Sequence, residues 1–187
     1  MTKTLSFAFY YFVSVKPLLC LLLKSLMTII TTPKHVLTQH GFANVVLDTC
    51  TNQKSLNAVK VIEAAELISF FNAKATYSSP TYLTIQTGSN KHITLMPEFL
   101  QYINHSCEPN VFFDTTLMQL IALKRIEIDE ELRFFYPSSE WKMTQSFVCN
   151  CSASNCLQLI QGAAYLSSDV VKQNQFTDYI KQQLADI

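Results

Sequence analysis

Three cysteines fall within eight residues near the C-terminal end of the chain: Cys149, Cys151 and Cys156. A structural zinc ion takes four ligands in a tetrahedron, and thiolates at about 2.3 Å are among its best partners. A loop with this spacing supplies three ligands, so the fourth must come from elsewhere. Cys107 is the remaining cysteine inside a constrained turn, and three thiols without a metal are the alternative. Because a Cys-x-Cys pair is a poor disulfide, the pattern also favours a reducing compartment and a cytoplasmic location.

The composition is that of a globular protein with one domain. Of 187 residues, 49% are apolar and 15% are charged, and 14 basic residues balance 14 acidic ones. No basic block is present, so we expect no direct binding of nucleic acid. With three glycines in the whole chain, a glycine-rich loop for nucleotide phosphates is nearly excluded.

Residues 1–30 form an apolar leader or a mis-called start. The runs Leu5–Val15 and Leu18–Leu23 are each shorter than the roughly 18 to 20 residues that cross a bilayer, so we expect no transmembrane span. One interpretation is that Met27 is the true start. The alternatives are a signal or surface anchor, which would mean export, and a folded N-terminal helix.

The rest of the chain is predicted to be mostly β with a few short helices. Pro97 opens a helical turn, and the apolar spacing of residues 58–71 suits a helix. Residues 168–187 resemble a one-sided helix that packs on the body of the protein. Short apolar runs between polar turns predict strands at Asn44–Leu47, Thr81–Thr87, His92–Leu95, Val111–Phe113, Met118–Ile126 and Glu131–Phe135.

Two further segments belong with the cysteine trio. Asn104–Asn110 reads Asn-His-Ser-Cys-Glu-Pro-Asn, and Glu130–Pro137 reads Glu-Glu-Leu-Arg-Phe-Phe-Tyr-Pro. In this order the three pieces resemble the SET domain with its post-SET zinc loop, especially that of small stand-alone bacterial SET proteins. The match runs from about residue 80 to 166, and more faintly back to about 45. Each motif alone is moderately specific, and the ordered set is highly specific.

The resemblance implies a fold and its division. The fold is several small sheets with a pseudoknot-like C-terminal crossing, closed by the zinc loop. Residues 31–148 would form the SET domain, 149–166 the post-SET loop and 167–187 a C-terminal helix. The oligomeric state does not follow from the sequence.

The resemblance also implies an activity: S-adenosylmethionine-dependent transfer of methyl groups to the lysine amine of a protein or peptide. Tyr136 matches the catalytic tyrosine. Asn104, His105, Tyr136 and Leu157 would contact the cofactor. The zinc ligands would be Cys107, Cys149, Cys151 and Cys156.

Aromatic residues near Tyr136 are candidates for the substrate channel. Phe134 stands where the family chooses between phenylalanine and tyrosine, and a phenyl group there leaves room for more than one methyl. Phe113 is a second channel candidate, although core packing is the simpler explanation for it, as it is for Phe112 and Phe135.

The chain departs from the family pattern at several glycines. None occurs in Gln53–Ala58, where a glycine-rich turn would meet the cofactor, and Ser152 and Gln158 replace glycines of the zinc loop. Ala65 stands at the glycine of an Ala-Gly-Glu turn, which makes Leu67–Phe71 a strand and conflicts with the helical periodicity. Gln101 replaces a common arginine before the Asn-His string.

Two alternative functions stand beside lysine methylation of a protein. A Cβ atom where backbone must approach a ligand is an obstacle. One alternative is therefore a zinc-stabilised SET-like binding module that has lost turnover. Another is a methyltransferase that acts on a small peptide or amine.

Overall fold

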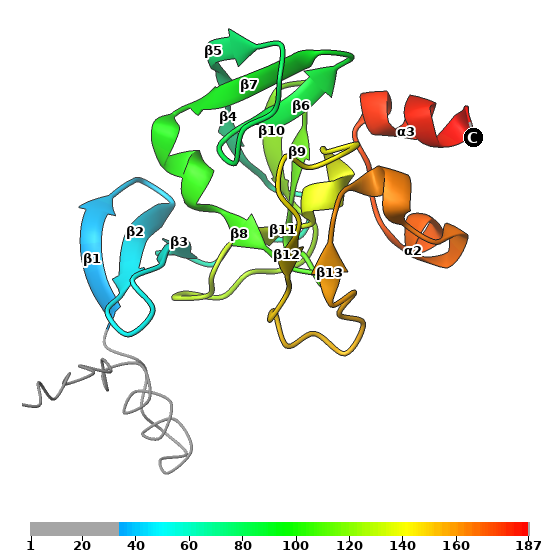
Figure 1. The fold of residues 1–187 in the computed structure, drawn as a ribbon. Coiled ribbons are helices and arrows are strands. Elements are labelled where there is room, and N and C mark those ends of the chain that lie inside the picture. Colours follow the sequence, from blue (N-terminus) through cyan, green and yellow to red (C-terminus); the bar gives the residue numbers. More distant parts are fainter. Residues whose placement is uncertain (1–33, 187) are drawn as a thin grey trace, which may run out of the picture.

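The computed structural model describes residues 34–186, and the expectations for residues 1–30 lie outside this range. The chain forms small sheets and short helices around a β-rich centre (Figure 1). The mostly-β prediction is therefore confirmed. No helix within residues 34–186 is long and apolar enough to cross a membrane.

The N-terminal sheet is an antiparallel meander of β1 (Lys34–Gln39), β2 (Ala43–Asp48) and β3 (Lys54–Ala58). Strand β1 is exposed along its whole length, so main-chain pairing with β2 holds it. The inner end of β3 is buried, and Leu56 accepts a hydrogen bond from the backbone of Leu132. This contact joins the sheet to the centre of the molecule.

Two antiparallel three-stranded sheets form the centre. One has the order β4 (Leu67–Phe70), β10 (Gln119–Ala122), β9 (Val111–Asp114). The other has the order β5 (Asn72–Tyr77), β7 (Lys91–Met96), β6 (Ile85–Gly88). Both run through the middle and upper part of Figure 1.

Two short strand pairs carry the sequence motifs. Strand β8 (Asn104–His105) pairs in parallel with β11 (Arg133–Phe134), which brings the strings Asn104–Asn110 and Glu130–Pro137 side by side. Strands β12 (Phe147–Val148) and β13 (Leu159–Ile160) are antiparallel and flank the cysteine loop. The remaining elements are the 3-10 helices η1 (Glu98–Tyr102), η2 (Tyr136–Ser138) and η3 (Ala163–Tyr165), and the α-helices α2 (Ser168–Gln173) and α3 (Asp178–Ala185).

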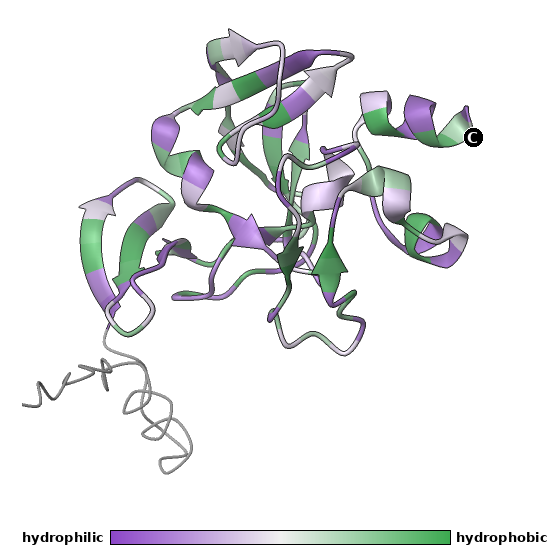
Figure 2. Cartoon of the chain, viewed as in Figure 1, coloured by the Kyte–Doolittle hydropathy of each residue, from purple (hydrophilic) through white to green (hydrophobic). Residues whose placement is uncertain are grey.

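The largest hydrophobic cluster joins the N-terminal and central sheets, and Phe113, Leu120 and Leu132 are fully buried in it. A second cluster packs the C-terminal helices on the body through Phe135, Phe176 and Trp141. Figure 2 shows apolar residues on β2, β12 and β13, and polar and apolar residues mixed along α3.

Gly162 brings the chain past Trp141 at close range. Its φ is +119°, and a Cβ atom there would lie 2.6 Å from the Trp141 carbonyl oxygen. Only glycine tolerates this approach.

The helical periodicity of residues 58–71 is wrong, and the strand implied by the resemblance is present as β4. Ile62 forms an isolated bridge with Ile126, and Ala65 turns the chain with a φ of +64°. The apolar residues of this segment therefore serve separate pairings, and tertiary contacts override the helical spacing.

Other boundaries also differ from the sequence-based expectations. The single helix expected at 168–187 is two helices within the described part, 168–186, because an extended stretch at Asn174 lets Phe176 reach the second cluster. Thr81 and Thr84 close a hydrogen-bonded turn, so the strand there begins only at Ile85. The strands expected at 118–126 and 131–135 shorten to β10 and β11.

Candidate active site and metal centre

Four sulfur atoms come together where the Asn-His-Ser-Cys string meets the loop between β12 and β13. The Sγ atoms of Cys107, Cys149, Cys151 and Cys156 all lie within 4.8 Å of one another. Four thiolates on one zinc ion lie about 3.8 Å apart, given tetrahedral angles and bonds of about 2.3 Å. The Cys107–Cys149 separation of 4.0 Å is close to that spacing.

The surroundings of the sulfurs suit thiolates that share a cation. Backbone N–H groups point at two of them, from Leu157 to Cys107 Sγ and from Cys151 to Cys149 Sγ, each at 3.4 Å. Burial raises the pKa of Cys107 and of Cys149. Without a cation these two buried thiols therefore favour the protonated form. Four thiolates in this volume would need a divalent ion to balance their charge, and the donor set fits zinc.

His105 links the sulfur cluster to Tyr136. Its Nδ1 accepts a hydrogen bond from the Tyr136 backbone N–H at 3.2 Å, and its Nε2 lies 3.4 Å from Cys107 Sγ. Burial lowers the pKa of His105 to about 4, so the ring is neutral near pH 7. The proton therefore sits on Nε2 and points at the sulfur.

Tyr136 opens η2 and turns its ring inward among other aromatic rings. The Phe134 ring lies 4.6 Å away, the His105 ring 5.1 Å and the Phe147 ring 6.0 Å, between centroids. Burial, and after it the charge of Glu131, raise the pKa of Tyr136 to about 12. The phenol therefore stays neutral and can both donate and accept a hydrogen bond.

A cleft of about 1000 Å³ lies beside this phenol and brings most of the expected site residues together. Asn104, His105, Phe113, Phe134 and Tyr136 all line it. Phe113 and Phe134 are both buried, and their rings lie 4.9 Å apart at an edge-to-face angle. They form an apolar wall next to the phenol.

Three other candidate residues lie outside the lining of this cleft. Leu157, expected to cover the cofactor, lines a separate hollow of about 260 Å³ beside α2. Phe112 is buried outside the cleft lining, and Phe135 packs in the second cluster. Both phenylalanines are therefore packing residues of the protein interior.

The opposite part of the cleft is polar. Asn104 donates from Nδ2 to the Lys54 carbonyl at 2.9 Å and to a Glu131 carboxylate oxygen at 2.8 Å. Gln53 and Arg133 also line this part. Sequence reasoning did not single out Glu131 or Arg133, although both belong to the string that ends in Tyr136.

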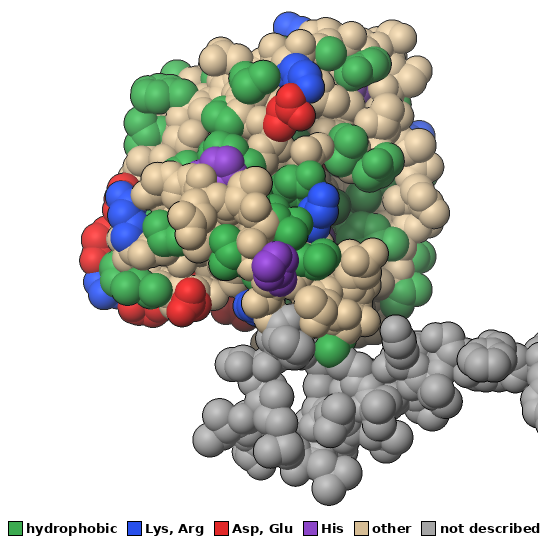
Figure 3. Space-filling view, turned by 90° about the vertical axis from the view of Figure 1, so that its left-hand side faces the viewer, with side chains coloured by type: hydrophobic (Ala, Val, Ile, Leu, Met, Phe, Trp, Pro, Cys, Tyr) green, Lys and Arg blue, Asp and Glu red, His purple; other side chains and the backbone are tan. Residues whose placement is uncertain are grey.

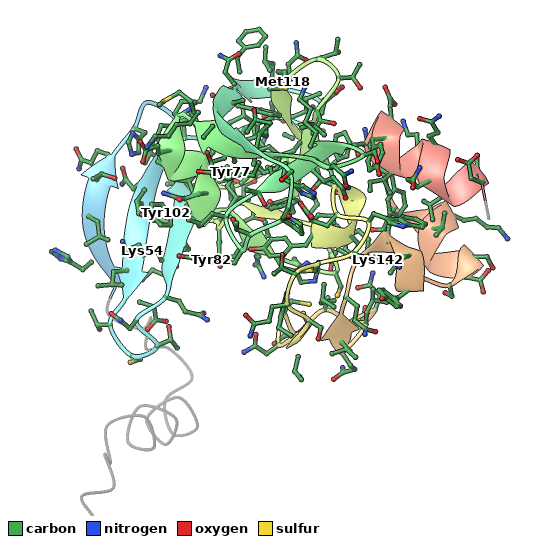
Figure 4. All side chains as sticks on the ribbon, turned by 45° about the horizontal axis from the view of Figure 1, so that its top comes forward. Lys54, Tyr77, Tyr82, Tyr102, Met118 and Lys142 are labelled. Carbon is green, nitrogen blue, oxygen red and sulfur yellow. The ribbon has the colours of Figure 1, made fainter. Side chains whose placement is uncertain are left out.

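Aromatic and basic groups lie around the cleft and beside it. Lys54 Nζ lies 4.9 Å from the centroid of the Tyr102 ring, and both residues are labelled in Figure 4. Tyr82, also labelled there, lines the cleft and is 87% exposed. On the face drawn in Figure 3, acidic, basic and apolar side chains are interspersed.

The positions that lack the family glycines keep a glycine-like backbone. Ala65, Ser152 and Gln158 have φ values of +64°, +62° and +65°. Non-glycine residues enter this left-handed region at a cost of roughly 1–2 kcal/mol each. The chain thus retains the turns and accepts the strain.

Comparisons with known proteins agree with this geometry. A family model described as "SET domain" matches residues 24–137. The protein named "Methyltransferase flvH" of Aspergillus flavus is 35% identical over 133 residues, covering 70% of this chain and 74% of its own.

Two solved structures are also similar. One is KRYPTONITE in complex with mCHG DNA and SAH, at 23% identity and a TM-score of 0.41, covering 57% of this chain and 26% of that one. The other is the methyltransferase domain of human histone-lysine N-methyltransferase SETMAR, at 16% identity and a TM-score of 0.45, covering 71% and 59%. The family match and the curated relative together show that this chain belongs to the SET domain family of methyltransferases.

Proposed function

We propose that this protein transfers methyl groups from S-adenosylmethionine to the side-chain amine of lysine in a protein substrate. One observation supports this most strongly. The phenol of Tyr136 lies in an aromatic cleft that is also lined by Cys149 and Cys151 of the four-sulfur cluster, so segments distant in sequence converge on a single pocket. Membership of a methyltransferase family supports the reaction class, and the aromatic wall favours an amine as the acceptor.

Methyl transfer to nitrogen requires a neutral amine aligned with the donor group. A lysine amine has a pKa of about 10.4 and is charged in water at pH 7. The apolar wall of Phe113 and Phe134 disfavours the charged form, and the Tyr136 hydroxyl can orient the nitrogen lone pair. The cofactor supplies the electrophilic methyl group on its sulfonium.

The polar part of the cleft has the groups that the cofactor's amino-acid end requires. Asn104 and Glu131 offer acceptors for an ammonium group, and Arg133 offers donors for a carboxylate. The backbone beside His105 would meet the adenine. Gln53 lines the cleft and begins the segment Gln53–Ala58, where the family has a glycine-rich turn, so its side chain would have to turn aside when the cofactor is bound.

Zinc is the metal we propose for the sulfur cluster, with Cys107, Cys149, Cys151 and Cys156 as ligands. Its role is structural, because all four positions are thiols and none is left for a reacting water. The ion would hold the loop between β12 and β13 against the cleft.

Phe134 bears on the number of methyl groups. A phenyl ring lacks the hydroxyl that would hold the amine through a further hydrogen bond and occupy space beside it. We therefore propose that the enzyme adds more than one methyl group.

Labelled methyl transfer tests the proposal. The protein is incubated with methyl-labelled S-adenosylmethionine and a cell lysate, and labelled products are separated by size and analysed by mass spectrometry. We expect label on protein lysines, and a loss of about 10²- to 10³-fold in Tyr136→Phe, which removes one hydroxyl at the reacting centre. Tyr77→Phe is the matched control, since Tyr77 is exposed on β5 (Figure 4).

Two outcomes would replace the proposal. Label confined to small molecules would favour a peptide or amine substrate. Absence of cofactor binding in calorimetry, at millimolar S-adenosylmethionine, would favour a binding module without turnover.

A further inference from the structure

Glu140 is a buried acidic residue in the cleft that has no role in the reaction as proposed above. It lies four residues after Tyr136, lines the same cleft and is only 8% exposed. None of the ion pairs among residues 34–186 includes it. A carboxyl group is costly to bury without a cationic partner, so its presence in the cleft wall calls for an explanation.

The main chain fixes the carboxyl group firmly in place. Oε1 accepts a hydrogen bond from the Gln86 backbone N–H at 2.9 Å, and the Gln86 side chain accepts one from the Trp141 N–H at 2.9 Å. The Glu140 backbone donates to the Tyr136 carbonyl at 3.2 Å and accepts from Ala163 at 2.8 Å. Hydrogen bonds therefore anchor both the Glu140 main chain and one oxygen of its carboxyl group.

The hydrogen bond from Gln86 does not by itself require an acid. The N–H of Gln86 needs one acceptor, and the neutral amide oxygen of a glutamine would satisfy it. What an ionisable carboxyl adds is the capacity to carry a negative charge on the wall of the cleft, and a cation that enters the cleft favours that charged form.

We propose that Glu140 binds the ammonium group of the incoming substrate and accepts its proton before the methyl group is transferred. This inference rests on the proposed function, because it assigns the cation to the methyl acceptor. The substrate class that follows is a primary or secondary alkyl amine that arrives in its charged form.

The proton balance is complete within the cleft. The ammonium gives one proton to the Glu140 carboxylate, leaving a neutral amine and a carboxylic acid. The nitrogen lone pair then forms the N–C bond as the C–S bond of the sulfonium breaks, and that electron pair stays on sulfur. The methylated ammonium leaves, and the carboxylic acid releases its proton to water.

The acidity of Glu140 is consistent with a role as proton acceptor. Burial raises the pKa of Glu140 to about 8, and the Gln86 N–H lowers it against that trend. The difference in acidity between this carboxyl group and an alkylammonium of pKa about 10.4 thus falls from about six orders of magnitude to about two. Such a match favours proton transfer near neutral pH.

Other titratable groups border the same space, and a pH profile must be separated from theirs. They are His92 on β7, which pairs with Gln86, His105 on β8, Glu131 and Arg133 beside β11, Tyr82 and Tyr136 in the cleft lining, and the thiols of Cys149 and Cys151. The variant Glu140→Gln leaves all of these groups in place and removes only the Glu140 carboxyl.

The test compares wild type with Glu140→Gln, a nearly isosteric change that keeps an acceptor for Gln86. Transfer of labelled methyl groups from S-adenosylmethionine to lysate proteins is measured for both between pH 6 and 10. The binding of S-adenosylmethionine is followed by calorimetry. Glu98→Gln is the matched control, an exposed glutamate that pairs with Lys74. A wild-type sample with carboxyl-¹³C glutamate is titrated by NMR with and without n-butylammonium.

The sign of the pH effect follows from the ionised forms required. Wild-type kcat/KM falls about tenfold per pH unit below about 8, where Glu140 takes up a proton. The variant depends on free amine, so its kcat/KM rises about tenfold per unit up to about pH 10. We expect kcat/KM of wild type to exceed that of Glu140→Gln by about 10²- to 10³-fold at pH 7. The two values should converge near pH 10, with cofactor binding unchanged.

The NMR arm separates the two proposals. The carboxyl signal absent from Glu140→Gln should titrate near pH 8, and n-butylammonium should lower that midpoint, since a nearby cation favours the carboxylate. If wild type labels nothing while the midpoint still falls, the proposed function fails and the ammonium site stands. Equal pH profiles in wild type and variant, with a midpoint indifferent to n-butylammonium, would overturn the inference.

Discussion

The body of the protein and its cysteine loop differ in how much apolar surface they bury. The body packs Phe113, Leu120 and Leu132 out of contact with water, whereas Val148 at the start of the loop is 76% exposed. The loop has only a small cluster of its own around Ile160, and its four sulfurs lie within 4.8 Å of one another. Apolar burial therefore builds the floor of the cleft, and metal binding is expected to build the side that the loop supplies.

The largest expected effect separates the two regions outright. Cys151→Ser should abolish methyl transfer, because metal binding and loop folding are one event worth on the order of 10 kcal/mol. Hydrogen exchange should show loss of protection in β12 and β13 while β9 and β10 stay protected. Metal analysis should find the zinc gone.

The control is Ser154→Ala, an exposed change in the same loop, which should keep both zinc and activity. Full activity in Cys151→Ser without bound zinc would contradict the account of the loop.

A change in the body should have the opposite signature. Leu120→Ala empties a fully buried position in the middle strand of its sheet and should cost about 2–5 kcal/mol of unfolding free energy. Urea denaturation measures the loss. The zinc affinity of the folded protein should not change, because Leu120 lies in a different cluster from the sulfurs.

Leu117→Ala is the comparison, since Leu117 is 60% exposed just before the same strand and should cost less than about 0.5 kcal/mol. A weaker zinc affinity in Leu120→Ala would mean that the two regions do not fold independently.

The body and the cysteine loop also differ in how their structure can be predicted from the sequence. The gathering of the cysteines follows from ligand chemistry and from family resemblance, both of which are visible as spacing. Strands such as β7 and β9 follow from apolar patterns. In contrast, β1 has an exposed side chain at every position, so main-chain pairing holds it and no apolar alternation marks it.

Site residues without a spacing signature are also hidden in the sequence. Glu140 is a single acid between a serine and a tryptophan, and only the hydrogen bond from Gln86, 54 positions away, shows that it is held in the cleft. Leu157 shows the reverse case. Its place in the string predicts a cofactor contact, and in the structure its backbone N–H points at Cys107 while its side chain packs against both the C-terminal cluster and the cysteine cluster.

The smallest effect concerns strain within the loop itself. Ser152 holds a φ of +62°, so Ser152→Gly should relieve roughly 1–2 kcal/mol of left-handed strain and lose up to about 1 kcal/mol through a more flexible unfolded chain. Because folding of the loop and metal binding are coupled, the net gain should tighten zinc binding about two- to fivefold in a competition titration with a chelator. Ser154→Gly is the matched control, an exposed serine of the same loop outside the set of residues with positive φ, and it should weaken binding slightly through the entropy term alone. Equal effects of the two glycines would show that backbone strain does not limit the stability of the loop.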